Sequence, residues 1–275
     1  MTTTLAEKAR KFFERHQSGE LLILPNAWDV ASARLIEDAG YTALATTSAG
    51  IGYALGYPDL HCLSREQMMA AVKPIIDAVA AAVTVDVENG YGETPEDVSK
   101  TIRDLIAIGS VGCNIEDVSS YTDGTLADVG LVADRLRAAR ETADGEGIDL
   151  VINARTDGYL IGGNGPAVFS NSVARGNAYL EAGARAVFVP GLRQEIEIAD
   201  MVREINGPLN LVTCPGLPSL SRLQELGVAR VSTGSSLARN AYGSLRGALH
   251  ELMAAGTYSY TENAVSFDDM DGLFV

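Results

Sequence analysis

Apolar, β-branched runs of strand length alternate eight times with longer helical patterns along this chain of 275 residues. The short runs predict buried strands, and the segments with apolar residues at every third or fourth position predict amphipathic helices. Strict alternation of this kind is typical of a parallel sheet with helices on its faces. Eight such units in a chain of this length predict a closed (β/α)8 barrel of the TIM type, with a doubly wound open sheet as the alternative fold.

No linker or low-complexity stretch divides the pattern, so we expect a single barrel domain over residues 1–275. An amphipathic N-terminal helix is predicted within residues 1–20, and a helical C-terminal segment within residues 235–275. The predicted strands are 21–25, 42–46, 82–86, 111–115, 149–153, 185–189, 209–213 and 228–232. The predicted helices are 29–39, 64–81, 94–108, 128–143, 166–182, 193–205, 218–226 and 235–255.

Composition restricts the possible partners and the location. Twenty-one basic against 36 acidic side chains give a net charge of −15, which argues against binding to nucleic acid or to anionic membranes. The apolar runs are too short for a membrane span, and the charged N-terminus lacks the apolar core of a signal peptide. The three cysteines, Cys62, Cys113 and Cys214, have no paired spacing, which indicates a cytoplasmic protein without a zinc motif.

Carboxylates stand where predicted strands end, which is where barrel enzymes place their active sites. Asp86 and Glu88 follow one apolar run, Glu116 follows the next, and Arg155 follows the one after. The three carboxylates could hold one oxygen-liganded cation, most simply Mg²⁺, or could equally cap helices and pair with buried arginines. Arg155 could clamp a substrate carboxylate bidentately, or it could form a salt bridge to Glu116 or Asp117, and both roles are compatible.

Other strand ends carry weaker signals. Ser48, Ala49 and Gly50 form a small-residue loop whose N–H groups could bind an anion. Asp59 lies in a long connection, where a cap or turn role is favoured from the sequence alone, and Asn26 ends the first strand. Because polar residues concentrate on the first five strand ends, we expect the substrate toward the first half of the barrel.

The histidines and cysteines offer little for catalysis. His61 is the only histidine near the predicted site, so a histidine metal centre or a Ser–His–Asp triad is poorly supported. Cys113 lies inside a strand and is expected in the core, whereas Cys214 ends a strand and is a candidate pocket residue without an evident activating base.

Five segments carry a resemblance to a known family. LPNAWDVASARLIEDAGY, TTSAGIGYALGYPDL, VDVENGYG, IEDV and INARTDGY, within about residues 24–160, resemble motifs of the isocitrate lyase/phosphoenolpyruvate mutase superfamily. The resemblance implies a barrel enzyme dependent on Mg²⁺, with Mn²⁺ as the other candidate ion, that makes or breaks C–C or P–C bonds beside an α-keto acid. A metal chelated by such an acid stabilises the charge of an enolate.

The same resemblance implies roles for individual residues. Asp86 would be the direct metal ligand, and Glu88 and Glu116 would bind the metal directly or through water. Arg155 would bind the keto or carboxylate oxygens of the substrate. From the resemblance we assign substrate binding to Ser48, Ala49, Gly50, Asp86 and Arg155, and we add Asn26 from its place at a strand end. We assign catalysis to Arg155, Glu116 and Asp59, and we add Tyr121 as a hypothesis of our own.

The chain departs from the superfamily in the segment that covers the site. Residues 117–127 contain neither the cysteine-containing lid of the lyases nor the lysine and asparagine of the mutase lid, and Tyr121, Ser119 or Ser120 are the substitutes we consider. Pro190 and Gly191 stand where the lyases place a substrate-binding glutamate. These departures leave the reaction open.

We therefore expect a lyase that cleaves a C–C bond of a small α-keto or 2-hydroxy di- or tricarboxylate, such as isocitrate, methylisocitrate or oxaloacetate. A phosphoenolpyruvate or phosphonopyruvate mutase or hydrolase is one alternative, and a non-catalytic α-keto acid-binding protein is another. The resemblance also implies a C-terminal helix exchanged between subunits, and so a homodimer or homotetramer; a helix that simply closes the barrel is the alternative.

Overall fold

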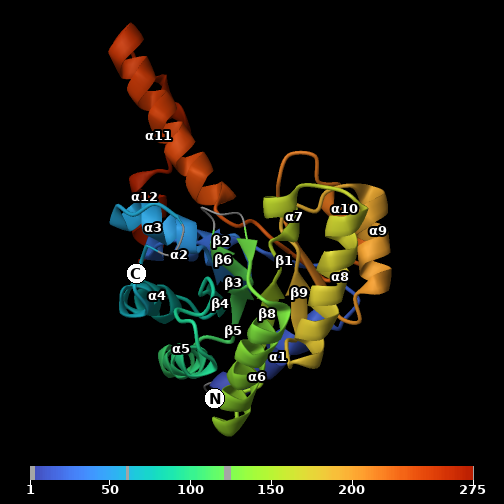
Figure 1. Ribbon diagram of the computed structural model, residues 1–275. Helices are drawn as coiled ribbons and strands as arrows, with labels where there is room; N and C mark the ends of the chain where they lie inside the picture. The colour runs from blue at the N-terminus through green and yellow to red at the C-terminus, as the bar shows by residue number, and fades with distance from the viewer. Residues whose placement is uncertain (1–3, 60–61, 121–124, 275) are drawn as a thin grey trace.

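The computed structural model describes residues 4–59, 62–120 and 125–274, and its centre is a parallel sheet closed into a barrel (Figure 1). Within these ranges the sheet order is β1-β11-β10-β9-β8-β5-β4-β3-β2. β1 (Leu22–Leu24) pairs with β11 (Arg230–Ser232), and β2 (Asn26–Ala27) pairs with β3 (Ala43–Thr46). Pro25, which has no N–H to donate, separates β1 from β2. The two segments are therefore halves of one strand, and the predicted eight-stranded barrel is confirmed.

Each predicted strand and helix overlaps an observed element. The remaining barrel strands are β4 (Ala82–Asp86), β5 (Gly112–Glu116), β8 (Val151–Arg155), β9 (Ala186–Phe188) and β10 (Leu209–Val212). The surrounding helices are α2 (Val30–Asp38), α4 (Arg65–Ala78), α5 (Pro95–Ile108), α6 (Val129–Gly145), α8 (Pro166–Glu181), α9 (Glu195–Glu204), α10 (Leu220–Glu225) and α11 (Ser236–Ala255). The predicted N-terminal helix is α1 (Leu5–His16).

Several short elements were not predicted. They are α3 (Ser48–Leu55), α7 (Gly158–Gly162) and an antiparallel pair, β6 (Val118–Ser120) with β7 (Thr125–Leu126). The predicted helical C-terminal segment contains, besides α11, the short helices η1 (Ser259–Asn263) and α12 (Phe267–Gly272). Two glycines and a serine in the SAGIGYAL sequence lower the helix propensity of α3, so the sequence resembles a loop. Its helical state places an N-terminus at the carboxyl end of the sheet, where the acidic residues lie.

Local signals explain why the helices begin and end where they do, and α5 is an example. Thr94 precedes the helix, and its Oγ1 accepts a hydrogen bond from the Asp97 N–H at 3.2 Å. Pro95 takes the first helical position, where no N–H is needed. Gly109 ends the helix with a φ of 94°, a left-handed conformation that favours glycine. The turn then leads directly into β5 and the acidic end of that strand.

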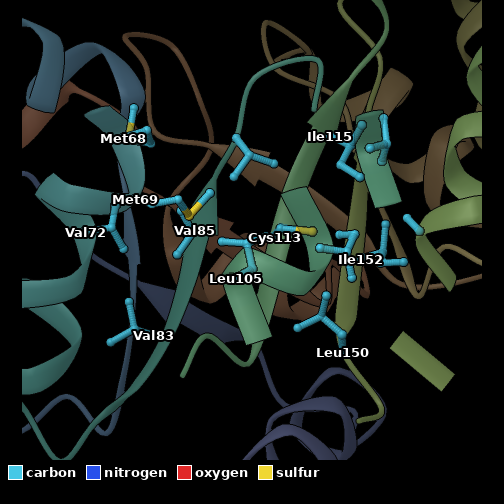
Figure 2. Close-up of a cluster of buried hydrophobic side chains, with 14 of the residues drawn as sticks. Met68, Met69, Val72, Val83, Val85, Leu105, Cys113, Ile115, Leu150 and Ile152 are labelled. Carbon is cyan, nitrogen blue, oxygen red and sulfur yellow. The ribbon is translucent and has the colours of Figure 1, made fainter. Parts of the chain in front are cut away.

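The outward faces of the strands pack against the helices, as Figure 2 shows for β4, β5 and β8. Val85, Cys113 and Ile152 from these strands contact a cluster that includes Met68 of α4 and Leu105 of α5, and all five are fully buried. Side chains alternate between the two faces of a strand. Residues that flank these outward positions therefore point into the barrel, which directs the side chains at the strand ends toward its mouth.

The inside of the barrel has two parts. At the amino ends of the strands, Phe12 of α1 joins an apolar cluster with Leu22, Leu24, Val111 and Val151, so α1 plugs this end. Above this cluster the interior is polar, because four buried side chains replace the branched apolar residues that usually fill such barrels. They are Asn114, Asn153, Asn210 and Arg230.

The C-terminal helix α11 extends away from the barrel (Figure 1). Its side chains Leu245, Leu249, Leu252 and Met253 are exposed. Within the described ranges, no helix has both the length and the apolar character needed to cross a membrane.

Candidate active site

Three of the predicted site residues lie at neighbouring strand ends. Asp86 ends β4, Glu116 ends β5 and Arg155 ends β8, with Glu116 directly opposite Arg155 in the strand register. Asp86 and Glu116 are buried. The fold therefore brings together the carboxylates and the arginine that the sequence singled out.

The N-terminus of α3 is directed at Asp86. The Ser48 hydroxyl donates to Asp86 Oδ2 at 2.9 Å, and the Ser48 N–H lies 3.5 Å from the same oxygen. The Gly50 N–H donates to the Thr47 side chain, which begins the helix. The expected small-residue loop is thus the first turn of a helix, and the partial positive charge of its N-terminus faces the Asp86 side chain. Asp86 Oδ1 is buried and has no hydrogen-bond partner among the described residues.

Arg155 is held by two carboxylates. Its Nη1 lies 2.8 Å from Glu116 Oε2, and its Nε and Nη2 donate to the two oxygens of Asp157 at 2.6 and 2.9 Å. The guanidinium also lies 5.7 Å from the centre of the Phe188 ring. The expected salt bridge to Glu116 is confirmed, whereas Asp117 is not a partner of this arginine. Bidentate pairing fixes the plane of the guanidinium at the wall of the site.

Asp117 instead anchors the backbone behind Arg155. Its Oδ1 accepts from the Asp157 N–H at 3.0 Å, and its Oδ2 accepts from the Tyr179 hydroxyl at 2.9 Å and from Arg175 Nη1 at 3.2 Å. Burial raises the pKa of Asp117, while these hydrogen bonds and the Arg175 charge oppose the rise. The network holds Asp157, and through Asp157 it holds Arg155.

The turn after β4 has an unusual backbone. Glu88 and Tyr91 have φ values of 53° and 56°, in the left-handed region that side chains rarely occupy. Burial raises the pKa of the Tyr91 phenol, and the charges of Glu88, Asp86 and Glu116 raise it further. The charges of these three carboxylates therefore act on the same phenol, and the strained turn carries Glu88 toward the strand ends of Asp86 and Glu116.

The side chains at these strand ends could bind a divalent metal, but only some of them by direct contact. Among the described residues, no group of three His, Cys, Asp or Glu side chains is arranged to enclose a metal ion. Asp86 Oδ1 nevertheless offers a buried oxygen without a hydrogen-bond partner, which suits one direct ligand. Mg²⁺ usually keeps several waters and binds through one or two carboxylates, so Glu88 and Glu116 suit contacts through water.

A cavity of about 260 Å³ lies at the mouth of the barrel. Its walls include Asn26, Thr47, Ser48, Ala49, Asp59, Asp86 and Asn114 from the first half of the chain. They also include Arg155, Leu160, Phe188, Pro190, Gly191, Val212, Thr213, Cys214, Ser232, Thr233, Gly234, Ser235 and Arg239 from the second half. The loops of all the barrel strands therefore wall a central cavity. That the substrate lies toward the first half of the barrel stays a prediction.

The other predicted residues fall into different environments. The Asn26 side chain closes the barrel, since its Oδ1 accepts from the N–H groups of Thr233 and Gly234 at 2.8 and 2.9 Å. Asp59 is exposed at the edge of the cavity. Tyr121 and His61 lie outside the described residues.

Cys113 and Cys214 lie where the sequence indicated. Cys113 lies in the core, where burial raises the pKa of its thiol to about 12. Cys214 is half-buried and lines the cavity.

Asn114 and Arg239 are two polar residues of the cavity that were not singled out from the sequence. Asn114 stands two positions before Glu116 and so shares its inward face, a spacing that could have identified it. Arg239 lies in the first turns of α11, where nothing in the sequence distinguishes it from a surface arginine. It adds a second cation to the wall of the cavity.

The closed barrel and these groups define an α/β-barrel enzyme with a carboxylate- and arginine-lined site at its mouth. The phosphoenolpyruvate phosphomutase family matches residues 12–253, and the chain belongs to this family. The superfamily predicted from the five motifs is confirmed.

Three similar proteins illustrate the range of this superfamily. The 2-methylisocitrate lyase of Aeropyrum pernix is 28% identical over 244 residues, which cover 86% of this chain and 77% of the lyase. The crystal structure of a "putative lyase/mutase" from Burkholderia cenocepacia has a TM-score of 0.93 and 36% identity, covering 98% of this chain and 96% of that one. The structure of 2,3-dimethylmalate lyase, a member of the same superfamily, has a TM-score of 0.85 and 25% identity, covering 97% and 94%.

Proposed function

We propose that this protein is a Mg²⁺-dependent lyase that cleaves a C–C bond in a small α-keto or 2-hydroxy di- or tricarboxylate. The observation that carries the proposal is the pairing, in one cavity, of an open carboxylate oxygen on Asp86 with the clamped guanidinium of Arg155. The first suits a divalent cation, and the second suits the planar carboxylate of a keto acid. The lyases among its relatives support the C–C assignment.

The dimensions and charges of the cavity favour a small acid with two anionic ends. Its volume of about 260 Å³ lies below the usual range of drug-sized pockets. Arg155 stands on the acidic side, and Arg239 stands on the side formed by the last strand and α11. Phe188 and Leu160 add an apolar wall that accommodates methylene or methyl groups.

In this proposal the residues have distinct tasks. Asp86 would hold the metal directly, with Glu88 and Glu116 contributing through water, and bound Mg²⁺ would supply Lewis-acid stabilisation of negative charge on the keto acid. Ser48 orients Asp86 through the 2.9 Å hydrogen bond. Arg155 would bind and orient the substrate carboxylate, with its plane fixed by Glu116 and Asp157. Glu116, Asp59 and Tyr121 stay the candidates for proton transfer.

Chemistry at a P–C bond is the second candidate, because the family model that matches the chain is that of a phosphomutase. The missing mutase lid residues argue against it. A non-catalytic α-keto acid-binding protein is the third, motivated by the absence of a lid cysteine from residues 117–127. Product formation separates these three possibilities.

The exposed apolar side chains of α11 support the proposal of a homodimer or homotetramer. Leu245, Leu249 and Leu252 follow one another at helical spacing on a helix that extends away from its own barrel. A second copy that covers these residues would remove them from water. We expect light scattering to give a mass of two or four chains, and Leu245→Lys to lower it; a wild-type monomer would contradict the proposal.

The experiment that tests the function is a product assay on isocitrate, methylisocitrate, oxaloacetate and phosphonopyruvate, with Mg²⁺ and again with a chelator. We expect pyruvate, glyoxylate or another fragment of C–C cleavage, at roughly 1–10³ s⁻¹ on the right substrate, only with Mg²⁺. Asp86→Ala should abolish turnover. Asp134→Ala, which removes an exposed aspartate of α6 that pairs with Arg137, is the matched control and should keep it. Full activity of Asp86→Ala would refute the site.

A further inference from the structure

Asn114 lines the cavity beside Asp86, the carboxylate proposed to hold the metal. It is opposite Asp86 in the register of β4 and β5, and opposite Asn153 in the register of β5 and β8. Its side chain is buried and lines the cavity. What its amide presents to a ligand depends on whether the oxygen or the nitrogen faces upward.

The amide pair alone leaves this orientation open. Asn153 Nδ2 donates to Asn114 Oδ1 at 2.8 Å, and exchanging oxygen and nitrogen in both side chains would give an equivalent contact. Arg230 removes the ambiguity, because its Nη2 lies 3.4 Å from the same Asn114 atom and a guanidinium only donates. The atom that meets both donors must be the oxygen.

This contact crosses the inside of the barrel. Arg230 comes from β11 and Asn114 from β5, and these strands are not neighbours in the sheet. With its oxygen turned down toward Arg230, Asn114 directs its Nδ2 to the opposite side. Asn114 Nδ2 has no hydrogen-bond partner among the described residues, and the atom is not fully buried. It is therefore accessible to a ligand in the cavity.

Burial of Arg230 lowers the stability of the fold. Its side chain is completely buried, and its Nε and Nη1 have no hydrogen-bond partner among the described residues. Burial lowers its pKa to about 9, and the charge of Asp86 opposes this shift. An unpaired buried cation destabilises a fold compared with an apolar side chain of similar volume. Since Arg230 does not stabilise the fold, a functional role would explain an arginine at this position.

We propose that Asn114 is a substrate-binding residue whose N–H groups donate to an anionic oxygen of the bound acid, and that Arg230 is the positioning residue that fixes this orientation. The proposal rests on the proposed function and adds a donor to its site. The acid concerned is a planar α-keto acid or its enolate, whose oxygens would lie beside Asp86. A donor already oriented in the empty cavity costs no reorganisation when charge develops.

The test is calorimetric titration of the full-length protein with oxalate in the presence of Mg²⁺. In Asn114→Asp, a carboxylate would keep the contact with Arg230 but would present an acceptor instead of a donor to the ligand. We expect oxalate affinity to fall about 10- to 100-fold, the range for a lost hydrogen bond to a charged group, with no loss of melting temperature. Thr84→Val, which removes a buried hydroxyl from the same barrel interior but outside the cavity wall, is the control and should bind oxalate like the wild type.

A double-mutant cycle separates positioning from general structure. We expect Arg230→Met to weaken oxalate binding in the wild-type background and to have no further effect in an Asn114→Ala background. Equal effects of Arg230→Met in both backgrounds would overturn its role as a positioning residue. If Arg230→Met does not fold, Asn114→Asp still decides whether the donor matters. If the wild type binds oxalate and Asn114→Asp binds it with the same affinity, this proposal alone is refuted. If the wild type does not bind oxalate, the proposed function is refuted as well.

Discussion

A buried histidine at the base of the barrel makes stability dependent on pH. His16 ends α1, its ring packs edge-on against Phe12, and its Nδ1 lies 2.8 Å from the Phe12 carbonyl oxygen. Its Nε2 is buried without a hydrogen-bond partner among the described residues. Burial, and then the charge of Arg230, lower the pKa of His16 from 6.5 to about 3. The folded protein therefore keeps this ring neutral.

The sign and size of the effect follow from linkage. Between pH 6.5 and about 3 the unfolded chain binds a proton at His16 and the folded chain does not, so stability falls as the pH falls. Above pH 6.5 His16 is neutral in both the folded and the unfolded state, so it no longer lowers the free energy of unfolding. At one pH unit below the unfolded pKa, the unfolded state gains about 1.4 kcal/mol from protonation of this single group.

His16→Phe isolates this contribution, because it keeps an aromatic ring of similar shape and removes the titration. Urea unfolding followed by circular dichroism at pH 7.5 and 5.5 gives the free energy of unfolding of both proteins. We expect the wild type to lose about 1.4 kcal/mol more than His16→Phe over this interval. Equal losses in the two proteins would show that His16 is protonated in the folded state, and would refute the reasoning about its burial.

Three further substitutions test the site and its support. Arg155→Lys keeps a charge between Glu116 and Asp157 but loses the planar fork, so we expect calorimetry to show oxalate binding weakened about tenfold or more while Mg²⁺ binding is retained; normal oxalate affinity would make the arginine purely structural. Tyr179→Phe removes a donor to buried Asp117 and should lower the free energy of unfolding by about 1.5–3 kcal/mol in urea titrations; an unchanged free energy would show that this hydrogen bond does not stabilise the network. Thr94→Ala removes the cap of α5 and should cost about 1 kcal/mol in the same assay without changing oxalate affinity.

The barrel was predictable because its signals are local and repeated. β-Branched runs such as those of β4 and β5, and the Thr94–Pro95 start of α5, each specify one element. The alternation of eight such pairs then leaves few ways to close the sheet. The helix α3 was missed because its glycines have low intrinsic helix propensity, and the Thr47 cap and the tertiary contact of Ser48 with Asp86 outweigh that preference.

The site was predictable to the extent that its residues lie at strand ends. Asp86, Glu116 and Arg155 were found in this way, and the structure brings them together. The role of Asp157 as the bidentate partner of Arg155 was missed, because the geometry of a turn decides which carboxylate reaches a guanidinium. Arg239 was missed because a helix residue enters the cavity only through the angle at which α11 leaves the barrel.

The barrel interior was not predictable from hydrophobic patterning. Alternation indicates which strand residues point inward, but it does not say that Asn114 and Arg230 meet across the barrel. That contact depends on the distance between two strands that are far apart in the sequence and not adjacent in the sheet.

The measurement that tests the central claim most directly is titration of the wild-type protein with oxalate, a stable mimic of a keto-acid enolate, with Mg²⁺ and after treatment with a chelator. If the mouth of the barrel is a divalent-metal site for α-keto acids, oxalate will bind with Mg²⁺ and not without it, and Asp86→Ala will remove the binding. Binding that is equally strong without metal, or no binding under either condition, would show that the buried carboxylates serve the structure and not a metal-dependent reaction.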